Sequence, residues 1–537
     1  MTDDNIAPDQ LRSPDSLLRR RDLLKGFGAL GLGAVGAKFL RPGLHRPSSR
    51  FISEFSQAGS GPLSYSRVMD GKPRTGLESA AAPSPGSPRA RVLQRSTLNS
   101  VQMYLYTTAG RIGVEYTEEQ IATVARLYDM LTWVYAGTGV SEAAHSANPD
   151  VIVTEYFDLT WVGDYDQAPG QPWMPAPWGY VNAHEQFFSH WSPTASPKTR
   201  IPNPIFGYGT AKSPEMHQSN PTGTPHEWLA NPFDIDPAKP ANLDFWVNYF
   251  AARSGELISS SKMDGLMMDE VEQPYGVPPP FADNPWAWHK ALEQDLAFIR
   301  DRLGKDMVLF WNGIFGDMAL QPPHVRSIGP WARPASLDYY QWCDGAQMEL
   351  FVTSYAGPQV WPEPIWEEIL DLCMAMAKRG ILLAQAPILA EDPLIRSFVL
   401  ASFHLCKGER SYLSHRGGYN FPWFPEWTVQ LGAPTFTAEH ITGYRAVPVA
   451  RRSGVSAASG VVYARPFELG LALANPSDAG ASVWLAHPVY RVVPRGGGWI
   501  RADGTIPEGS IAYERVTRID LPSRSGALAF WGKPRST

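Results

Sequence analysis

The chain has 537 residues, which suits one large domain followed by a smaller one. With 44% hydrophobic and 19% charged residues it can bury a substantial core, which excludes a chain that is disordered throughout. The net charge of -6 and the lack of a long basic stripe in the body of the sequence argue against nucleic acid as the main partner.

A basic segment followed by a weakly apolar stretch opens the chain. Arg20 and Arg21 precede an apolar pair and a lysine, and the stretch behind them is rich in glycine and alanine. This stretch is too short and too mild for a stable membrane span. The order is typical of a twin-arginine signal. Residues 1–40 therefore predict export through the twin-arginine translocase, cleavage after Ala37 and a periplasmic or extracellular location without a lasting membrane anchor.

A glycine pattern inside this segment and the composition behind it complete the N-terminal part. Gly31, Gly33 and Gly36 match the dinucleotide-binding spacing, which functions only when a strand precedes the glycines. Arginines and an aspartate precede them here, so the match belongs to the signal and we expect no cofactor. Residues 41–95 mix proline, serine, glycine and arginine, a composition that predicts a disordered linker.

From residue 96 onward, short apolar runs alternate with helical segments or long connections. This alternation over residues 96–432 is typical of the α/β class and predicts a (β/α)₈ TIM barrel. The runs that we predict as its eight strands lie at 101–106, 131–135, 150–157, 263–268, 307–311, 344–350, 381–385 and 410–414.

The predicted helices lie between these runs. The first begins at Thr117, which is a suitable N-cap with Gln120 in the capping-box position, and it extends to Leu131. The stretch 158–224 is dense in proline, tryptophan and glycine and predicts a long inserted loop region, and loops of that length are usually functional. Further helices are expected at 243–259, 284–303, 364–379 and 393–406.

The pattern changes after residue 432. Short alternating strands separated by glycine and proline turns follow one another, which predicts an antiparallel β-sandwich over residues 433–537. Its expected strands are 469–474, 482–485, 489–493, 515–521 and 526–530.

Acidic residues close two of the barrel strands. In such barrels the C-terminal strand ends face the substrate, and the fourth strand ends in Asp269 and Glu270, whereas the sixth ends in Glu349. Cleavage of a glycosidic bond needs two carboxyl groups, one that attacks the anomeric carbon or activates water and one that protonates the leaving oxygen. We predict Asp269 as the nucleophile and Glu349 as the acid/base of a retaining reaction. Glu270 is the competitor of Asp269, because adjacent strand residues point to opposite sides.

Other strand ends offer polar or aromatic groups to a substrate. By contrast, Asp264 and Asp344 stand at the starts of their strands, each before a glycine, and we expect them to anchor the strand entrances. The residues predicted to bind substrate are Glu155, Asp158, Glu270, Trp311, Asn312 and Gln385.

Aromatic residues and cysteines add two further constraints. Many of the 19 tryptophans lie in proline-rich segments, and indole rings stack on the apolar faces of sugars, so we expect several in a substrate cleft. Cys343, Cys373 and Cys406 are far apart and show no ligand spacing with histidine, which predicts buried free thiols and no metal.

Several motifs give the chain a family resemblance. Asp264 to Asp269, the preceding Trp228 to Pro237, Asp344 to Glu349 and Phe467 to Pro476 together resemble the hypothetical TIM-barrel glycoside hydrolases, over residues from about 100 to 530. The chain is also similar to retaining α-galactosidase-like barrels, which place a nucleophilic Asp after the fourth strand and an acid after the sixth. That resemblance implies the same roles for Asp269 and Glu349, although the second acid here is Glu rather than Asp.

These features predict an exported glycoside hydrolase that acts on an extracellular or envelope poly- or oligosaccharide. The alternative is a non-catalytic carbohydrate-binding or envelope protein on the same barrel, which would use the aromatic residues without the paired acids. A third hypothesis, a cofactor-bearing oxidoreductase exported after loading, lacks a credible nucleotide loop or ligand cluster in the sequence.

Overall fold

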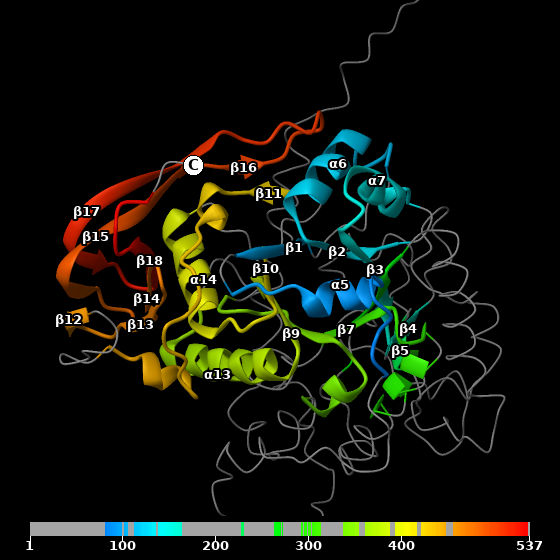
Figure 1. The fold of residues 1–537 in the computed structure, drawn as a ribbon, viewed down its shortest axis with the longest axis horizontal. Helices are drawn as coiled ribbons and strands as arrows, with labels where there is room; N and C mark the ends of the chain where they lie inside the picture. Colours follow the sequence, from blue (N-terminus) through cyan, green and yellow to red (C-terminus); the bar gives the residue numbers. More distant parts are fainter. Residues whose placement is uncertain are drawn as a thin grey trace, which may run out of the picture.

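The computed structural model describes the barrel core and the C-terminal domain (Figure 1). The described residues are 81–98, 101–105, 112–135, 138–159, 161–163, 227–229, 263–269, 271, 292–312 apart from 294, 298 and 302, 337–353, 360–386, 392–415, 420–446 and 455–534. The predicted signal, residues 41–80 of the predicted linker, the helix expected at 243–259 and nearly all of the predicted insertion lie outside them.

Eight parallel strands close into a barrel, and each of the eight predicted strands is confirmed. The strands follow one another around the barrel in chain order, and β10 pairs with β1 to close it. Each strand is covered on one side by the barrel interior and on the other by the helices, so residues pointing either way are buried and the strand is a short apolar run in the sequence. The strands are β1 (Gln102–Leu105), β2 (Met130–Val134), β3 (Ile152–Asp158), β6 (Gly265–Asp269), β7 (Val308–Asn312), β8 (Gly345–Met348), β9 (Ile381–Ala386) and β10 (Ser411–His415).

The helices of the barrel begin where their capping residues stand. Thr117 and Gln120 form the predicted capping box of α6 (Glu118–Leu127), which ends before the predicted Leu131 because β2 begins there. Asp392 caps α14 (Pro393–Cys406), whose bounds match the prediction, and residues between 292 and 303 are helical wherever they are described. The remaining helices of this part are α7 (Val140–Ala147) and α13 (Glu363–Arg379), with the 3-10 turn η6 (Leu337–Gln341).

Side chains along each strand alternate between the barrel interior and the helix layer. Inside, Met267, Phe310 and Leu383 belong to one buried cluster, whereas the neighbouring Leu266 and Leu309 belong to the cluster shared with the helices. Because residues that pair in register share a face, this alternation assigns a direction to the polar residues at each strand end.

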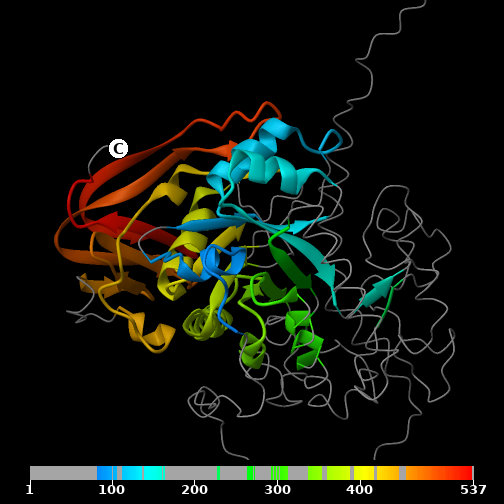
Figure 2. The ribbon, with the colours of Figure 1, turned by 45° about the vertical axis from the view of Figure 1, so that its right-hand side comes forward.

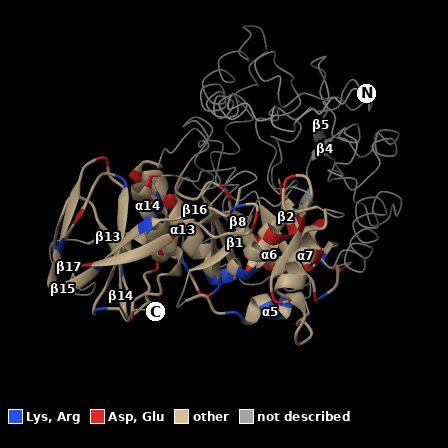
Figure 3. Ribbon diagram, turned by 90° about the horizontal axis from the view of Figure 1, so that it is seen from above, with Lys and Arg blue, Asp and Glu red and all other residues tan. Residues whose placement is uncertain are grey.

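The base of the barrel is covered by α5 (Pro88–Gln94), which corrects the prediction that all of 41–95 is a disordered linker. Val92 joins the interior cluster, and Arg91 and Arg95 pair with Asp264 and Asp129 at 3.1 and 2.8 Å. In Figure 3, α5 lies at the end of the barrel opposite to the pair β4 (Trp161–Gly163) and β5 (Glu227–Leu229), which follows the C-terminal end of β3. Local composition predicted a linker because the acids that pair with α5, Asp264 and Asp129, lie far from it in the sequence.

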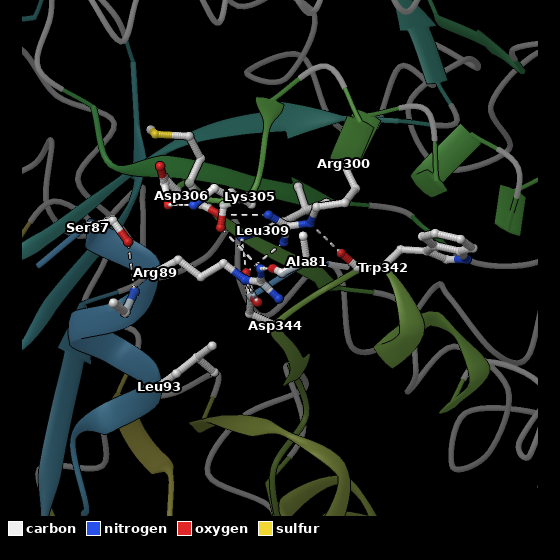
Figure 4. Close-up of polar contacts among 12 residues, drawn as sticks. Ala81, Ser87, Arg89, Leu93, Arg300, Lys305, Asp306, Leu309, Trp342 and Asp344 are labelled. Carbon is white, nitrogen blue, oxygen red and sulfur yellow. Dashed lines mark hydrogen bonds and ion pairs between the residues drawn. The ribbon is translucent and has the colours of Figure 1, made fainter. Parts of the chain in front are cut away.

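Asp344 anchors the entrance of β8 as predicted. One carboxylate oxygen accepts from Arg89 Nε at 2.5 Å, and the other accepts from Arg300 at 2.7 Å and from the Leu309 N–H at 2.9 Å (Figure 4). Trp342 supplies its carbonyl oxygen to the same Arg300. The acid therefore ties α5, the helical segment around residue 300 and two strands together.

Asp264 has the same role at the entrance of β6. It accepts hydrogen bonds from Arg91 and from the Val153 N–H, and it contacts His145 at 2.8 Å. The following glycine is required by close strand packing, because a Cβ at Gly265 would lie 2.0 Å from the Val308 carbonyl oxygen. Both Asp-Gly pairs therefore belong to the base of the barrel.

An antiparallel domain follows the barrel, as predicted, and packs against α14 (Figures 1 and 2). Ala472 and Leu528 face the barrel helices, whereas Leu471 and Ala527 face a separate small core. Hydrogen bonds join these six strands into one antiparallel sheet, and their predicted arrangement as a β-sandwich stays a prediction. They are β12 (Val455–Ser459), β13 (Tyr463–Pro466), β14 (Gly470–Asn475), β15 (Ala481–Gly496), β17 (Gly509–Leu521) and β18 (Ser525–Phe530).

A short pair of strands and the cysteines complete the described structure. The strands β11 (Pro422–Trp423) and β16 (Gly498–Trp499) pair across the two domains. Cys343, Cys373 and Cys406 are buried free thiols, as predicted. Within the described ranges, none of the helices combines the length and apolar character needed to span a membrane, and no group of three or more His, Cys, Asp or Glu side chains is arranged to hold a metal.

Candidate functional site

The C-terminal mouth of the barrel gathers polar side chains from consecutive strands. Asp269 ends β6, Asn312 ends β7 and Glu349 follows β8 directly. Asp269 and Asn312 each lie two residues after an interior residue of the same strand, Met267 and Phe310. Because side chains alternate along a strand, both face the inside of the barrel. The structure therefore brings together three residues that were predicted from separate strand ends.

Asp269 is held at both carboxylate oxygens. Tyr156 on β3 donates its hydroxyl to Oδ2 at 2.6 Å, and Asn312 donates Nδ2 to Oδ1 at 2.7 Å. The residue is only 7% exposed, so these charge-assisted hydrogen bonds are shielded from water and strong. The carboxylate is thereby fixed in position at the barrel mouth.

Asn312 also joins the two acids. The same Nδ2 donates to Glu349 Oε2 at 2.6 Å, so one amide nitrogen contacts both carboxylates. Because each oxygen lies 2.7 or 2.6 Å from that nitrogen, the two oxygens are separated by at most about 5.3 Å. Carboxyl groups of retaining glycosidases are about 5–5.5 Å apart and those of inverting enzymes about 6.5–9.5 Å apart.

A row of polar side chains continues from these acids across the barrel interior. Tyr104 donates its hydroxyl to Gln347 Oε1 at 3.2 Å, and Gln347 Nε2 donates to Gln385 Oε1 at 2.8 Å. Burial, together with the nearby charge of Glu349, raises the pKa of Tyr104 well above its usual value, so this hydroxyl keeps its proton and acts as a donor. The predicted residue Gln385 thus lies at the end of a fixed chain of hydrogen bonds.

An aromatic pair flanks Asp269 on the other side. Trp133 has a φ of 55° and lies at a register shift between Leu131 and Val134, which is the signature of a β-bulge that redirects a side chain. Its ring stacks on Tyr156 with the centroids 4.5 Å apart and the planes at 23°. Local strain of this kind is concentrated at functional sites.

Two residues predicted to bind substrate point away from the mouth. Glu155 is in register with Leu266 and faces the helix layer, so the inward position on β3 belongs to Tyr156, which sequence reasoning missed. Trp311 is completely buried and packs edge-on against Tyr340 with ring centroids 4.6 Å apart. These placements correct the predicted roles of Glu155 and Trp311.

The two remaining predicted residues cannot be placed at the site. The backbone of Asp158 pairs with that of Asp269, but its side chain lies outside the described part of the chain, as does all of Glu270. The alternation along β3 and β6 would have identified Tyr156 if the register of these strands had been known.

Comparison with known proteins gives one family match. The family model described as hypothetical glycosyl hydrolase family 15 matches residues 198–471, about half of the chain. No curated protein matches the sequence.

Solved structures provide distant likenesses. The isomalto-dextranase of Arthrobacter globiformis T6 complexed with panose is 11% identical with a TM-score of 0.35, covering 84% of this chain and 75% of that one. Endo-glycoceramidase II from Rhodococcus sp. is 11% identical with a TM-score of 0.32, covering 85% and 100%. A Cellulomonas fimi endo-beta-1,4-mannanase is 10% identical with a TM-score of 0.30, covering 83% and 99%. The barrel fold rests on the strand order of this chain and not on these likenesses.

Proposed function

The chain belongs to the hypothetical glycosyl hydrolase family 15, a family of glycoside hydrolases, and on that premise we propose that it cleaves its glycosidic bond with Asp269 and Glu349. The observation that carries this proposal is the hydrogen bonding of Asn312 Nδ2 to both carboxylates. A single neutral donor holds the two acids side by side at the barrel face where such enzymes bind substrate.

Asp269 serves as the nucleophile of a retaining reaction. One of its oxygens attacks the anomeric carbon, the bond to the leaving oxygen breaks, and Glu349 gives its proton to that oxygen. The product of this step is a glycosyl ester of Asp269. Glu349, now a carboxylate, then takes a proton from water, which attacks the anomeric carbon and releases Asp269. The two carboxylates share one donor, which places one oxygen of each within about 5.3 Å of the other and fits the close spacing of retaining enzymes.

Neutral donors suit this mechanism. Among the described residues, the carboxylate of Asp269 is held by the uncharged groups of Tyr156 and Asn312. Its charge is then available to the positive, oxocarbenium-like transition state that forms at the anomeric carbon. The Trp133 ring, which stacks on Tyr156, adds an apolar surface beside that tyrosine.

The place of action is part of the proposal. The Arg20-Arg21 segment and the mild apolar stretch after it support export by the twin-arginine pathway. The substrate would then be a poly- or oligosaccharide of the envelope or the surroundings, met without a stable membrane anchor.

A screen on 4-nitrophenyl glycosides and on soluble polysaccharides tests the proposal. The wild-type protein should hydrolyse at least one of them. Asp269→Asn should lower kcat/KM by at least about 1,000-fold on either kind of substrate, and Glu349→Gln should do so on the polysaccharide, whose leaving oxygen needs the proton. Proton NMR of the first product should show the anomer of the substrate. Full activity in both variants would refute the site, and a first product of the opposite anomer would refute retention.

A further inference from the structure

Beyond the two acids, the described part of the barrel interior holds buried polar atoms for which the structure gives no partner. Gln385 Nε2 and Ser414 Oγ are both buried without a hydrogen bond, and both residues have 0% exposure. The two residues pair in register on the seventh and eighth strands, β9 and β10. Ser414 has the parity of the interior residue Tyr412, so its hydroxyl is directed into the barrel.

Unpartnered buried polar groups are costly, and proteins keep few of them. A buried donor or acceptor without a partner costs about 1–3 kcal/mol. Two such groups side by side, on the two strands that follow the strand of Glu349 around the barrel, call for an explanation in terms of a ligand or a function. The Asn312 Oδ1 atom, which is also buried without a partner, extends the same arc to the fifth strand.

The orientation of Gln385 is set from inside the barrel. Tyr104 donates to Gln347, and Gln347 donates to Gln385 Oε1, so the amide NH₂ of Gln385 is the end that is left for another partner. This chain of bonds also holds the Gln385 side chain at a fixed height in the barrel. A group that has to recognise a hydroxyl needs such support, because a freely rotating amide loses selectivity.

We propose that Gln385 and Ser414 bind neighbouring hydroxyl groups of the sugar ring whose glycosidic bond is cleaved, and that they determine which sugar is accepted. The proposal rests on the proposed function and names its ligand class, a hydroxyl-bearing sugar ring seated deep in the barrel. Gln385 donates to one ring hydroxyl, and Ser414 exchanges a hydrogen bond with the next. Ser414 becomes a specificity-determining residue, whereas Tyr104 and Gln347 become positioning residues that act through Gln385.

The strand β10 contains a matched control. Ser411 is as buried as Ser414 and lies on the same strand, but its hydroxyl accepts a hydrogen bond from the Gly408 N–H at 2.9 Å. Ser414→Ala and Ser411→Ala therefore remove the same atom from the same strand, once without and once with a partner in the protein. A merely structural serine and a ligand-binding serine give opposite results in this pair.

The first experiment measures binding by saturation-transfer NMR with glucose, galactose, mannose and xylose as probes. At least one should bind the wild-type protein and Ser411→Ala equally, and should bind Ser414→Ala more weakly by about 2- to 12-fold, the value of one neutral hydrogen bond. The melting temperature of Ser414→Ala should equal or exceed that of the wild type, whereas that of Ser411→Ala should fall. The inference is overturned if none of the four sugars binds, if Ser414→Ala binds like the wild type, or if Ser414→Ala is the less stable variant.

The second experiment uses the glycoside that the activity screen identifies, together with its monodeoxy analogues. Ser414→Ala should lower kcat/KM for the parent glycoside but should cause no further loss for the analogue that lacks the partner hydroxyl. Equal losses on all analogues would overturn the inference. If sugars bind in a Ser414-dependent way and nothing is hydrolysed, the proposed function fails alone. If the glycoside is hydrolysed and Ser414→Ala has the same kcat/KM as the wild type, the inference about Ser414 fails but the proposed function stands.

Discussion

Asp344 and Asp269 lie at opposite ends of the barrel, and we expect the same Asp→Asn change to affect them in opposite ways. Asp344 accepts hydrogen bonds from two guanidinium groups, those of Arg89 and Arg300, and its side chain is 2% exposed. Asp269 accepts from the neutral groups of Tyr156 and Asn312, close to a second carboxylate. The described donors are therefore cationic at the first position and neutral at the second.

The size of the effect at Asp344 follows from its burial. Removing the charge leaves two arginines facing an amide, with side-chain exposures of only 10% for Arg89 and 5% for Arg300. Removing one partner of a buried ion pair costs about 3–5 kcal/mol. At about 2.1 cal/mol/K per residue, a unit of about 340 residues has an unfolding entropy of about 0.7 kcal/mol/K, so Asp344→Asn should lower Tm by about 4–7 °C. Asp269→Asn should leave Tm unchanged or raise it, because the donors described for Asp269 are neutral and side chains kept for activity are often not the most stable choice at their position.

Differential scanning calorimetry of the wild type and the two variants measures this difference. Both changes keep the shape of the side chain and turn one acceptor oxygen into an NH₂ donor, so each variant controls for the other. A Tm of Asp344→Asn within about 1 °C of the wild type would refute the anchoring role. A loss at Asp269→Asn as large as that at Asp344→Asn would show that Asp269 belongs to the structural framework as well.

Three further changes test other parts of the molecule. Tyr156→Phe should lower kcat/KM by about 10- to 150-fold on the identified glycoside, since it removes one hydrogen bond to the charged Asp269, with little change in Tm; an unchanged kcat/KM would exclude Tyr156 from the site. Burial, with a smaller effect of Arg465, lowers the pKa of Lys407 to about 7 in the folded protein. Because this lysine has a pKa of about 10.4 when unfolded, the unfolded chain binds more protons than the folded chain between pH 7 and about 10.4. The free energy of unfolding therefore rises with pH in that range. Lys407→Met should flatten that rise in urea titrations at pH 7, 8 and 9, and an equal slope in the variant would contradict this. Replacing Arg20 and Arg21 by lysine should retain the protein in the cytoplasm of a bacterial host, as fractionation and immunoblotting would show, and unchanged export would exclude the twin-arginine route.

Much of the barrel could be predicted because its information is local. Each strand is an apolar run of a few residues, and α14 begins at Pro393 behind the capping Asp392. The helix α5 was missed for the opposite reason. Arg89 and Arg91 are stabilised by acids on strands far along the chain, Asp344 and Asp264, and composition alone cannot report such partners.

The sequence predicted the acids of the candidate site, but not the directions in which the side chains on the strands point. The strand-end rule found Asp269, Asn312 and Glu349, which the structure brings together. It chose Glu155 over Tyr156 because a shift of one residue moves every side chain of a strand to the other face, and the sequence does not fix the register. The bulge that turns Trp133 toward Tyr156 depends on pairing between strands, so no local pattern announces it.

The two ends of the barrel use the same residue type for different physical purposes. At the base, Asp264 and Asp344 are paired with guanidinium groups, and these ion pairs link strands to helices. At the mouth, the donors described for Asp269 are an amide and a hydroxyl, which fix its geometry and keep its negative charge. A cation in place of Asn312 would hold the two acids equally well, but it would oppose the positive charge that develops on the sugar during bond cleavage. The neutral bridge is therefore the feature that makes this pair of acids suited to chemistry, and the cationic pairing is the feature that makes the other pair suited to support.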